Sequence, residues 1–167
     1  MGAPLRVLVP LRWADMDAFG HVNNVQYLRL LEIARIESLG QILGEAVLGG
    51  IVVARHEIEY LAPMDFRLAP VAVDLWVTRV GRTGFDVGYH VQDPPDVGER
   101  RYAVAATTMV LFDPVGGRPR ALTPGEVAGL QPHLGEPVAF RGRPAQGSRV
   151  DVPATRTAMP SRSSSRP

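Results

Sequence analysis

The stretch that decides the fold reads Arg12-Trp-Ala-Asp-Met-Asp-Ala-Phe-Gly-His-Val-Asn-Asn24, and a strongly helical run from Val25 to Leu39 follows it at once. It places two carboxylates, a glycine, a histidine and two asparagines directly before the expected helix. Backbone N–H groups in the first turn of a helix have no acceptor inside the helix, so they can hold a developing oxyanion. A carboxylate in the preceding loop can act as a base or as a nucleophile. The stretch therefore predicts a catalytic loop at the start of a long helix.

The helical run over residues 25–39 carries apolar residues over most of its circumference, with only a narrower polar stripe. That pattern predicts a helix that is largely enclosed by other structure. Asn23 and Asn24 are both good N-cap residues. Gly40 is the expected C-terminal stop.

The rest of the chain is typical of an antiparallel sheet. A first strand is expected over residues 5–13, where Pro10 favours an edge position or a bulge. Four further strands, rich in Val, Tyr, Phe and Thr, are expected over residues 51–60, 71–80, 85–92 and 101–112, with turns at 81–84 and 93–98. A short helix could start at Thr123. One long helix with a curved antiparallel sheet wrapped around it is an α+β arrangement.

Composition and charge divide the chain into two parts. The 167 residues are 46% hydrophobic and 21% charged, which suits one soluble domain with a real core. After residue 140 the composition becomes rich in Arg, Pro, Ser and Gly, so we expect a folded domain over 1–140 and a disordered tail over 141–167. Without the strongly basic tail the body is mildly acidic, which argues against nucleic-acid binding.

Several classes of site and location are disfavoured by what the sequence lacks. The chain has no cysteine, so it has no thiolate nucleophile and no disulfide. The four histidines have no metal-ligand spacing, so no metal site is expected. The start of the sequence lacks the apolar core of a signal peptide, and no apolar run reaches the length of a membrane span. A cytoplasmic protein without membrane contact is the expectation.

The segment Asp15-Met-Asp-Ala-Phe-Gly-His-Val-Asn-Asn24 resembles the signature of hotdog-fold acyl-CoA thioesterases, the 4-hydroxybenzoyl-CoA thioesterase-like family. The resemblance covers about residues 5–132 and is densest over 12–37. It implies a hotdog fold and hydrolysis of an acyl-CoA to a free acid and coenzyme A, without a bound cofactor. It also implies a homodimer or homotetramer with the active site between subunits.

The resemblance assigns the two central catalytic groups. It implies that Asp17 is the catalytic acid and that the backbone N–H of Asn24 holds the oxyanion. From the residues alone, Asp17 could instead be a turn or capping residue. Asp15 is expected to pair with Arg12 or to brace the loop, and a supporting electrostatic role for it stays open.

The remaining candidates are expected to contact substrate or to support the loop. Gly20 would allow close approach of the thioester or an unusual turn. His21 could contact substrate or transfer a proton, although bracing the loop is the favoured interpretation. Asn23 could contact the substrate carbonyl, although a cap is slightly favoured. Tyr27 is expected in the wall of the acyl pocket.

Arginines supply the candidates for coenzyme A phosphates, notably Arg55 and Arg82. Glu32, two turns into the helix, suits an ion pair with Arg29 or Arg35.

Two alternatives to an acyl-CoA thioesterase stay open. One is a thioesterase that acts on acyl-carrier protein, which the acidic body mildly disfavours. The other is a non-catalytic acyl-CoA-binding hotdog protein, which the intact loop around Asp17 disfavours.

Overall fold

The computed structural model describes residues 2–44, 47 and 50–142, so the expected tail lies almost wholly outside the described residues. Within these ranges the long elements are a single helix, α1 (Asn24–Leu43), and four long strands, β2 (Ile51–Tyr60), β3 (Val71–Val80), β4 (Gly84–Gln92) and β5 (Arg101–Asp113). Short elements complete the fold: strands β1 (Leu5–Val9) and β6 (Arg118–Pro119), helix α3 (Pro124–Leu130), and 3-10 turns at Trp13–Asp15 and Gln131–His133.

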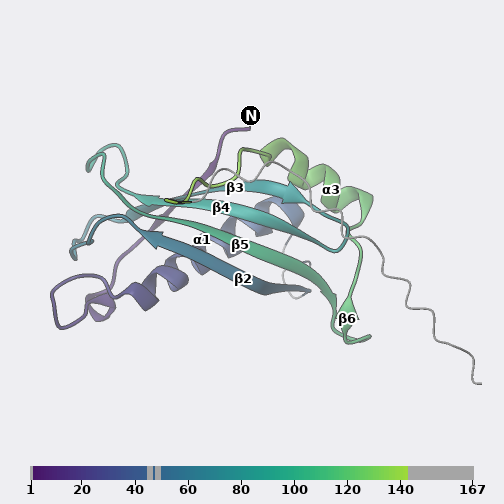
Figure 1. Cartoon of the computed structure of the whole chain (residues 1–167), viewed down its shortest axis with the longest axis horizontal. Coiled ribbons are helices and arrows are strands. Elements are labelled where there is room, and N and C mark those ends of the chain that lie inside the picture. Colours follow the sequence, from purple (N-terminus) through teal and green to yellow (C-terminus); the bar gives the residue numbers. More distant parts are fainter. Residues whose placement is uncertain (1, 45–46, 48–49, 143–167) are drawn as a thin grey trace, which may run out of the picture.

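The strands form one antiparallel sheet in the order β1-β3-β4-β5-β2, with β6 paired to the end of β5. β1 and β2 are therefore the two edge strands, and α1 lies along one face of the curved sheet (Figure 1). The β3–β4 and β4–β5 connections are the two expected turns, and Gly81 N–H donates to the Gly84 carbonyl in the first of them. The predicted α+β fold is confirmed.

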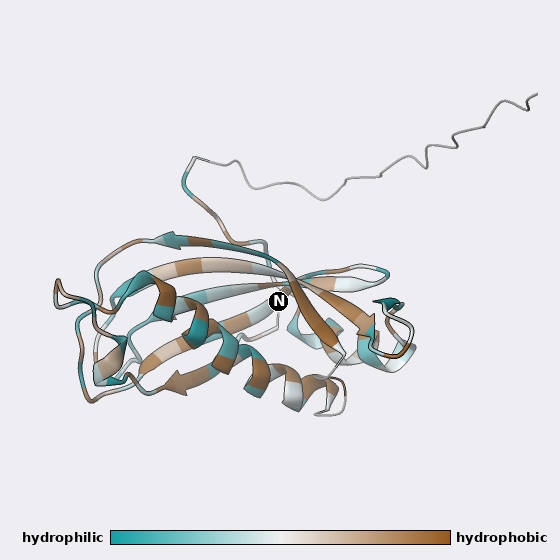
Figure 2. Cartoon of the chain, turned by 90° about the horizontal axis from the view of Figure 1, so that it is seen from below, coloured by the Kyte–Doolittle hydropathy of each residue, from teal (hydrophilic) through white to brown (hydrophobic). Residues whose placement is uncertain are grey.

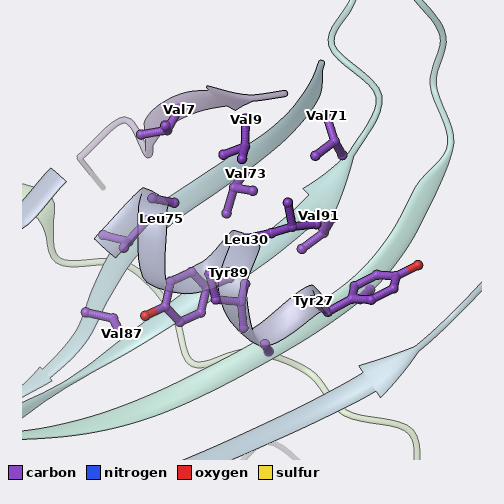
Figure 3. Close-up of a cluster of buried hydrophobic side chains, with 14 of the residues drawn as sticks. Val7, Val9, Tyr27, Leu30, Val71, Val73, Leu75, Val87, Tyr89 and Val91 are labelled. Atoms are coloured by element: carbon purple, nitrogen blue, oxygen red, sulfur yellow. The ribbon is translucent and has the colours of Figure 1, made fainter. Parts of the chain in front are cut away.

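The core lies between α1 and the inner face of the sheet. The helix contributes side chains spaced three and four residues apart, which is the spacing that keeps one face on the sheet: Tyr27, Leu30, Leu31, Ala34, Arg35, Ser38 and Leu39. Alternate residues of β3 and β4, such as Val73, Leu75, Val87 and Tyr89, meet this face (Figure 3). Fully burying one such aliphatic side chain is worth about 1.5–3 kcal/mol.

The final described segment covers part of the opposite face of the sheet. Trp76 on this face donates its indole N–H to the Glu136 carbonyl at 2.7 Å, and Gly135 N–H donates to the Val77 carbonyl at 2.8 Å. The segment ends where Arg141 pairs with the carboxylate of Glu59 on β2.

Two expected element boundaries are wrong. The first strand ends at Val9 rather than at residue 13, because Pro10 has no N–H to continue the ladder. The long helix passes through Gly40 and ends at Leu43, where Gly44 takes the left-handed φ of 82°. A glycine inside a helix costs only about 1 kcal/mol relative to alanine, which the partly buried Ile42 and Leu43 beyond it can offset.

The expectation that α1 is enclosed by other structure is also wrong for the single chain. Val25 and Ile36 are 63% and 51% exposed on the side of α1 away from the sheet. Figure 2 shows α1 running along the sheet with hydrophobic segments recurring along it. None of the helices in the described ranges is long and apolar enough to cross a membrane.

Candidate active site

The loop before α1 is a small hairpin with a defined shape. Met16 and Val22 form an antiparallel bridge, and Asp17 N–H donates to the His21 carbonyl at 2.8 Å. Gly20 takes a positive φ of 82°, which other residues resist. Val22 N–H donates to the Met64 carbonyl at 2.7 Å, so the hairpin is anchored to the segment that follows β2.

Asp17 lies on this hairpin with one carboxylate oxygen held and the other available. Its Oδ1 accepts the backbone N–H of Phe19 at 2.8 Å and, more weakly, that of His21 at 3.4 Å. Within the described residues, no hydrogen bond or ion pair reaches Oδ2 of Asp17. The side chain is half-buried, so this oxygen can meet a bound substrate or a water molecule.

Asp15 has the opposite environment, because both of its oxygens are occupied. Its Oδ1 accepts from Nε and Nη2 of Arg12 at 2.9 and 2.8 Å. Its Oδ2 accepts from the Arg12 backbone N–H at 2.7 Å and from Nη2 of Arg29 at 2.5 Å. The expected pairing with Arg12 is confirmed, and Arg29 of α1 joins it.

This network sets the charge of Asp15. The side chain is fully buried, and burial alone would raise the pKa of its carboxyl. Hydrogen bonds from the backbone and side chain of Arg12, together with the charge of Arg29, more than offset that effect and lower the pKa below its usual value. Asp15 is thus a fixed anion that ties the loop to the first turns of α1.

The start of α1 supplies an available N–H donor. Asn23 is the N-cap, and its side-chain oxygen accepts the Val25 N–H at 3.0 Å. Asn24 is the first helical residue, and no acceptor among the described residues takes its backbone N–H. An unpaired N–H at the positive end of a helix is a suitable donor to an oxyanion.

A shallow cavity of about 300 Å³ opens beside Asn24. Two tyrosine rings line it: Tyr27 from α1 and Tyr60 from the end of β2, packed edge to face at 5.1 Å. The Tyr60 hydroxyl donates to the Asn24 carbonyl at 3.0 Å and so fixes the end of β2 against the helix start. Burial and the neighbouring tyrosines raise the pKa of Tyr27 to about 12, which keeps its hydroxyl protonated. Asp17 does not line this cavity within one chain.

His21 lies next to Asp65, with Nε2 at 3.7 Å from its carboxylate, and the two residues also form an isolated β-bridge. This position agrees with the favoured role of bracing the loop.

The two arginines proposed for coenzyme A phosphates lie away from the loop. Arg55 is exposed on β2 and pairs with Glu57 at 2.6 Å. Arg82 is exposed in the β3–β4 turn, which lies at the opposite end of the sheet from the C-terminal end of β2 (Figure 1). Neither arginine meets Asp17 within a single chain.

The interpretation of Glu32 as an ion-pair partner of Arg29 or Arg35 is wrong. Arg29 pairs with Asp15, and Glu32 forms no ion pair with any described residue. The sequence did not predict Tyr60 as a residue of the site. The alternation that predicts a strand does not indicate which side chain at its end will contact a helix far away in the sequence. No group of three or more His, Asp or Glu residues in the described ranges could hold a metal ion.

Comparisons with known proteins identify the family and support the fold. The profile of the thioesterase-like superfamily matches residues 11–137. A search of curated proteins gives no significant match. Solved structures match well, among them a thioesterase from Thermus thermophilus complexed with coenzyme A and Zn, at 30% identity and a TM-score of 0.69, covering 82% of this chain and 98% of that one.

Two further structures extend the comparison. A protein from Xanthomonas campestris, proposed to be an acyl-CoA thioesterase, matches at 31% identity and a TM-score of 0.58, covering 67% of this chain and 95% of that one. A predicted thioesterase from Bacillus stearothermophilus matches at 21% identity and a TM-score of 0.73, covering 81% and 100% of the two chains, and supports the hotdog fold alone.

Proposed function

The chain belongs to the thioesterase-like superfamily, and from that premise we propose that it is an acyl-CoA thioesterase that releases a free carboxylic acid and coenzyme A. The observation that carries the proposal is the difference between the two loop carboxylates. Both oxygens of Asp15 accept hydrogen bonds from Arg12 and Arg29, whereas Oδ2 of Asp17 has no partner among the described residues, in the hairpin that directly precedes a helix start with an available N–H.

The proposed reaction uses these two groups in different ways. Oδ2 of Asp17 either takes a proton from the attacking water or attacks the thioester carbonyl directly. The backbone N–H of Asn24 donates to the carbonyl oxygen as it gains negative charge. The hydrogen bond from Phe19 N–H to Oδ1 fixes the carboxylate so that only one oxygen faces the reaction.

We further propose that two copies of the chain share the site. β2 is a ten-residue edge strand, and its Val52 and Val53 are 44% and 39% exposed. The unpaired N–H and C=O groups of such an edge are a template for pairing with a strand of another chain. A second copy paired antiparallel to β2 would also cover apolar residues of α1 such as Ile36, since Ile36 and the start of β2 border the same hollow.

That pairing would complete the substrate site. Two antiparallel copies of β2 place the Ile51 end of one beside the Tyr60 end of the other. The β3–β4 turn with Arg82 lies at the Ile51 end, because Thr83 O accepts from Leu111, the β5 partner of Ile51. Arg82 of one copy would then lie near the loop of the other, where coenzyme A phosphates are expected.

The test is release of free thiol from a panel of acyl-CoAs, from short aliphatic to long and aromatic acyl groups. The proposal requires turnover of at least one class and a dimer or larger species in light scattering. A protein that binds acyl-CoAs but releases no thiol would be a non-catalytic binder, and a fully active monomer would contradict the shared site.

A further inference from the structure

Arg35 is a buried cation that forms no ion pair with any of the described residues. It lies in the C-terminal half of α1, is only 7% exposed, and its Nη1 is fully buried without a hydrogen bond. No carboxylate in the described ranges forms an ion pair with it. Arginine stays charged under all physiological conditions, and an isolated buried charge is strongly unfavourable unless an anion compensates it.

The groups around Arg35 on the sheet do not supply that anion. Burial lowers the pKa of His56, the charge of Arg35 lowers it further, and Glu32 offsets these effects only in part. His56 instead uses Nδ1 to bond with Thr107 Oγ1 at 2.9 Å. Burial raises the pKa of the Tyr89 hydroxyl against the opposing charge of Arg35, so this hydroxyl also stays neutral. Arg35 therefore meets neutral polar groups on the sheet side.

A second cavity, of about 360 Å³, opens onto Arg35. Its walls are mainly apolar and come from α1, the first residues of β2 and β5, with Leu39, Val53 and Met109 among them. Glu32 also lines it, but is exposed. The volume is in the range of small-ligand sites, which combine apolar walls with a few fixed polar groups.

The position of this cavity relates it to the catalytic loop, on the premise of the shared site proposed above. It lies at the Ile51 end of β2. In the antiparallel pairing of two β2 strands, this end meets the Tyr60 end of the other copy, where Tyr60 is bonded to Asn24. The cavity of one copy would then lie on the side of the helix start of the other, and Asp17 and Asn24 are not among its lining residues, so it suits the acyl chain rather than the thioester itself.

We propose that this cavity binds the far end of the acyl group, and that Arg35 pairs with a carboxylate carried there, so that the preferred substrates are coenzyme A thioesters of dicarboxylic acids. The apolar walls take the methylene groups of the chain. The guanidinium of Arg35, which lines the cavity, donates a charge-assisted hydrogen bond to the terminal carboxylate. Glu32 keeps its own carboxylate in solvent and weakens this preference by modest like-charge repulsion.

The test compares pairs of substrates of equal chain length. Adipoyl-CoA and hexanoyl-CoA differ only by the terminal carboxylate, as do suberoyl-CoA and octanoyl-CoA. In the pair that is hydrolysed faster, wild-type kcat/KM should be about 10- to 100-fold higher for the dicarboxylic substrate. A ratio of this size corresponds to the contribution of one hydrogen bond to a charged group. Arg35→Met should reduce that ratio to about one or below, while Arg35→Lys should retain part of it.

Two further variants make the result specific. Arg118→Met removes an exposed arginine on β6 and should leave the ratio unchanged. Glu32→Gln removes the repulsion at the cavity mouth, is tolerated at an exposed position, and should raise the preference for the dicarboxylic substrate by a few fold. A wild-type ratio near one, or an unchanged ratio in Arg35→Met, would overturn the proposal.

A binding measurement separates this proposal from the thioesterase proposal. Isothermal titration calorimetry with adipate and hexanoate requires no hydrolysis. If adipate binds better in an Arg35-dependent way but no thioester is cleaved, the cavity assignment stands and the thioesterase proposal fails. If thioesters are cleaved without a dicarboxylate preference, the cavity assignment fails alone. If Arg35→Met changes the dimer dissociation constant and lowers kcat/KM equally for both members of a substrate pair, a carboxylate of the second copy is the partner of Arg35 and the proposal is wrong.

Discussion

The two ends of α1 differ in whether their buried charged side chain has a partner of opposite charge. At the N-terminal end, fully buried Asp15 lies between Arg12 and Arg29, and both of its carboxylate oxygens accept hydrogen bonds from these arginines. In the C-terminal half, buried Arg35 has no carboxylate partner in the described part of the chain, and Ser38 Oγ beside it on the helix is also buried without a hydrogen bond.

The difference shows which end is complete within one chain. At the N-terminal end the ion pairs of Asp15 fix the catalytic loop without any further partner. At the C-terminal end the buried charge of Arg35 has an unfavourable desolvation free energy, which a bound ligand or a second copy of the chain can offset. Substitutions at the two ends should therefore differ in sign as well as in size.

The largest effect is expected at Asp15. Asp15→Asn removes the charge that two arginines share and should lower the free energy of unfolding by about 3 kcal/mol, the lower part of the range for breaking a buried ion pair. The value is at the lower end because Arg12 is largely exposed and can return to solvent. Urea denaturation followed by circular dichroism measures it, and a loss below about 1 kcal/mol would contradict the network.

The same network predicts a difference in acid stability. The folded-state pKa of Asp15 is lowered, so its contribution is present above the unfolded-state value of about 4 and is lost as the pH falls below that value. Melting temperatures of wild type and Asp15→Asn should therefore converge over the interval below about pH 4. Parallel curves over that interval would show that Asp15 does not titrate with folding.

Asp17→Asn should affect catalysis without affecting folding. The substitution keeps the acceptor for Phe19 N–H but removes the anionic oxygen, so kcat should fall by at least about 10², a typical general-base contribution. Thermal stability should change little, because Oδ2 has no partner among the described residues. Thiol-release kinetics and a melting curve on the same sample distinguish this result from that of Asp15→Asn, which should be unstable but less impaired in kcat when folded. Near-normal turnover in Asp17→Asn would place the chemistry elsewhere.

Arg35→Met should stabilise the ligand-free protein. Replacing an uncompensated buried cation with an apolar side chain of similar length removes a desolvation cost, so the free energy of unfolding should rise by about 1–2 kcal/mol. Arg35→Lys keeps the charge and serves as the control, which should show no gain. A loss of stability in Arg35→Met as large as that in Asp15→Asn would mean that both ends of α1 are equally saturated.

The smallest effect is expected at the helix cap. Asn23→Ala removes the acceptor for Val25 N–H and should cost about 1 kcal/mol. For a chain of this size that corresponds to a fall in melting temperature of about 2–4 °C. Asn23→Ser keeps a capping oxygen and should recover most of the loss. If Asn23→Ala instead lowers kcat without changing the melting temperature, Asn23 contacts the substrate, which is the alternative that its sequence position left open.

Much of the fold was accessible from local patterns. The four long strands begin and end within one residue of their expected bounds, because alternation and turn residues act over short distances. Asn23 and Gly20 were recognisable for the same reason, since a cap and a left-handed turn depend on a few neighbouring residues. The end of α1 was missed because Gly40 is a weak local stop, and packing of the residues beyond it decided the outcome.

The sequence by itself determined the order of elements, the loop before α1 and the acids that lie on it, since each depends on periodicity or on residues a few positions apart. Only the tertiary structure decided which acid is free, because that depends on Arg29 reaching back to Asp15 across fourteen positions. The tertiary structure also placed Tyr60 against Asn24 and left Arg35 buried without an ion-pair partner among the residues that the structure describes. Contacts of this kind join residues whose separation along the chain carries no signal, so they are set by the way the helix packs on the sheet.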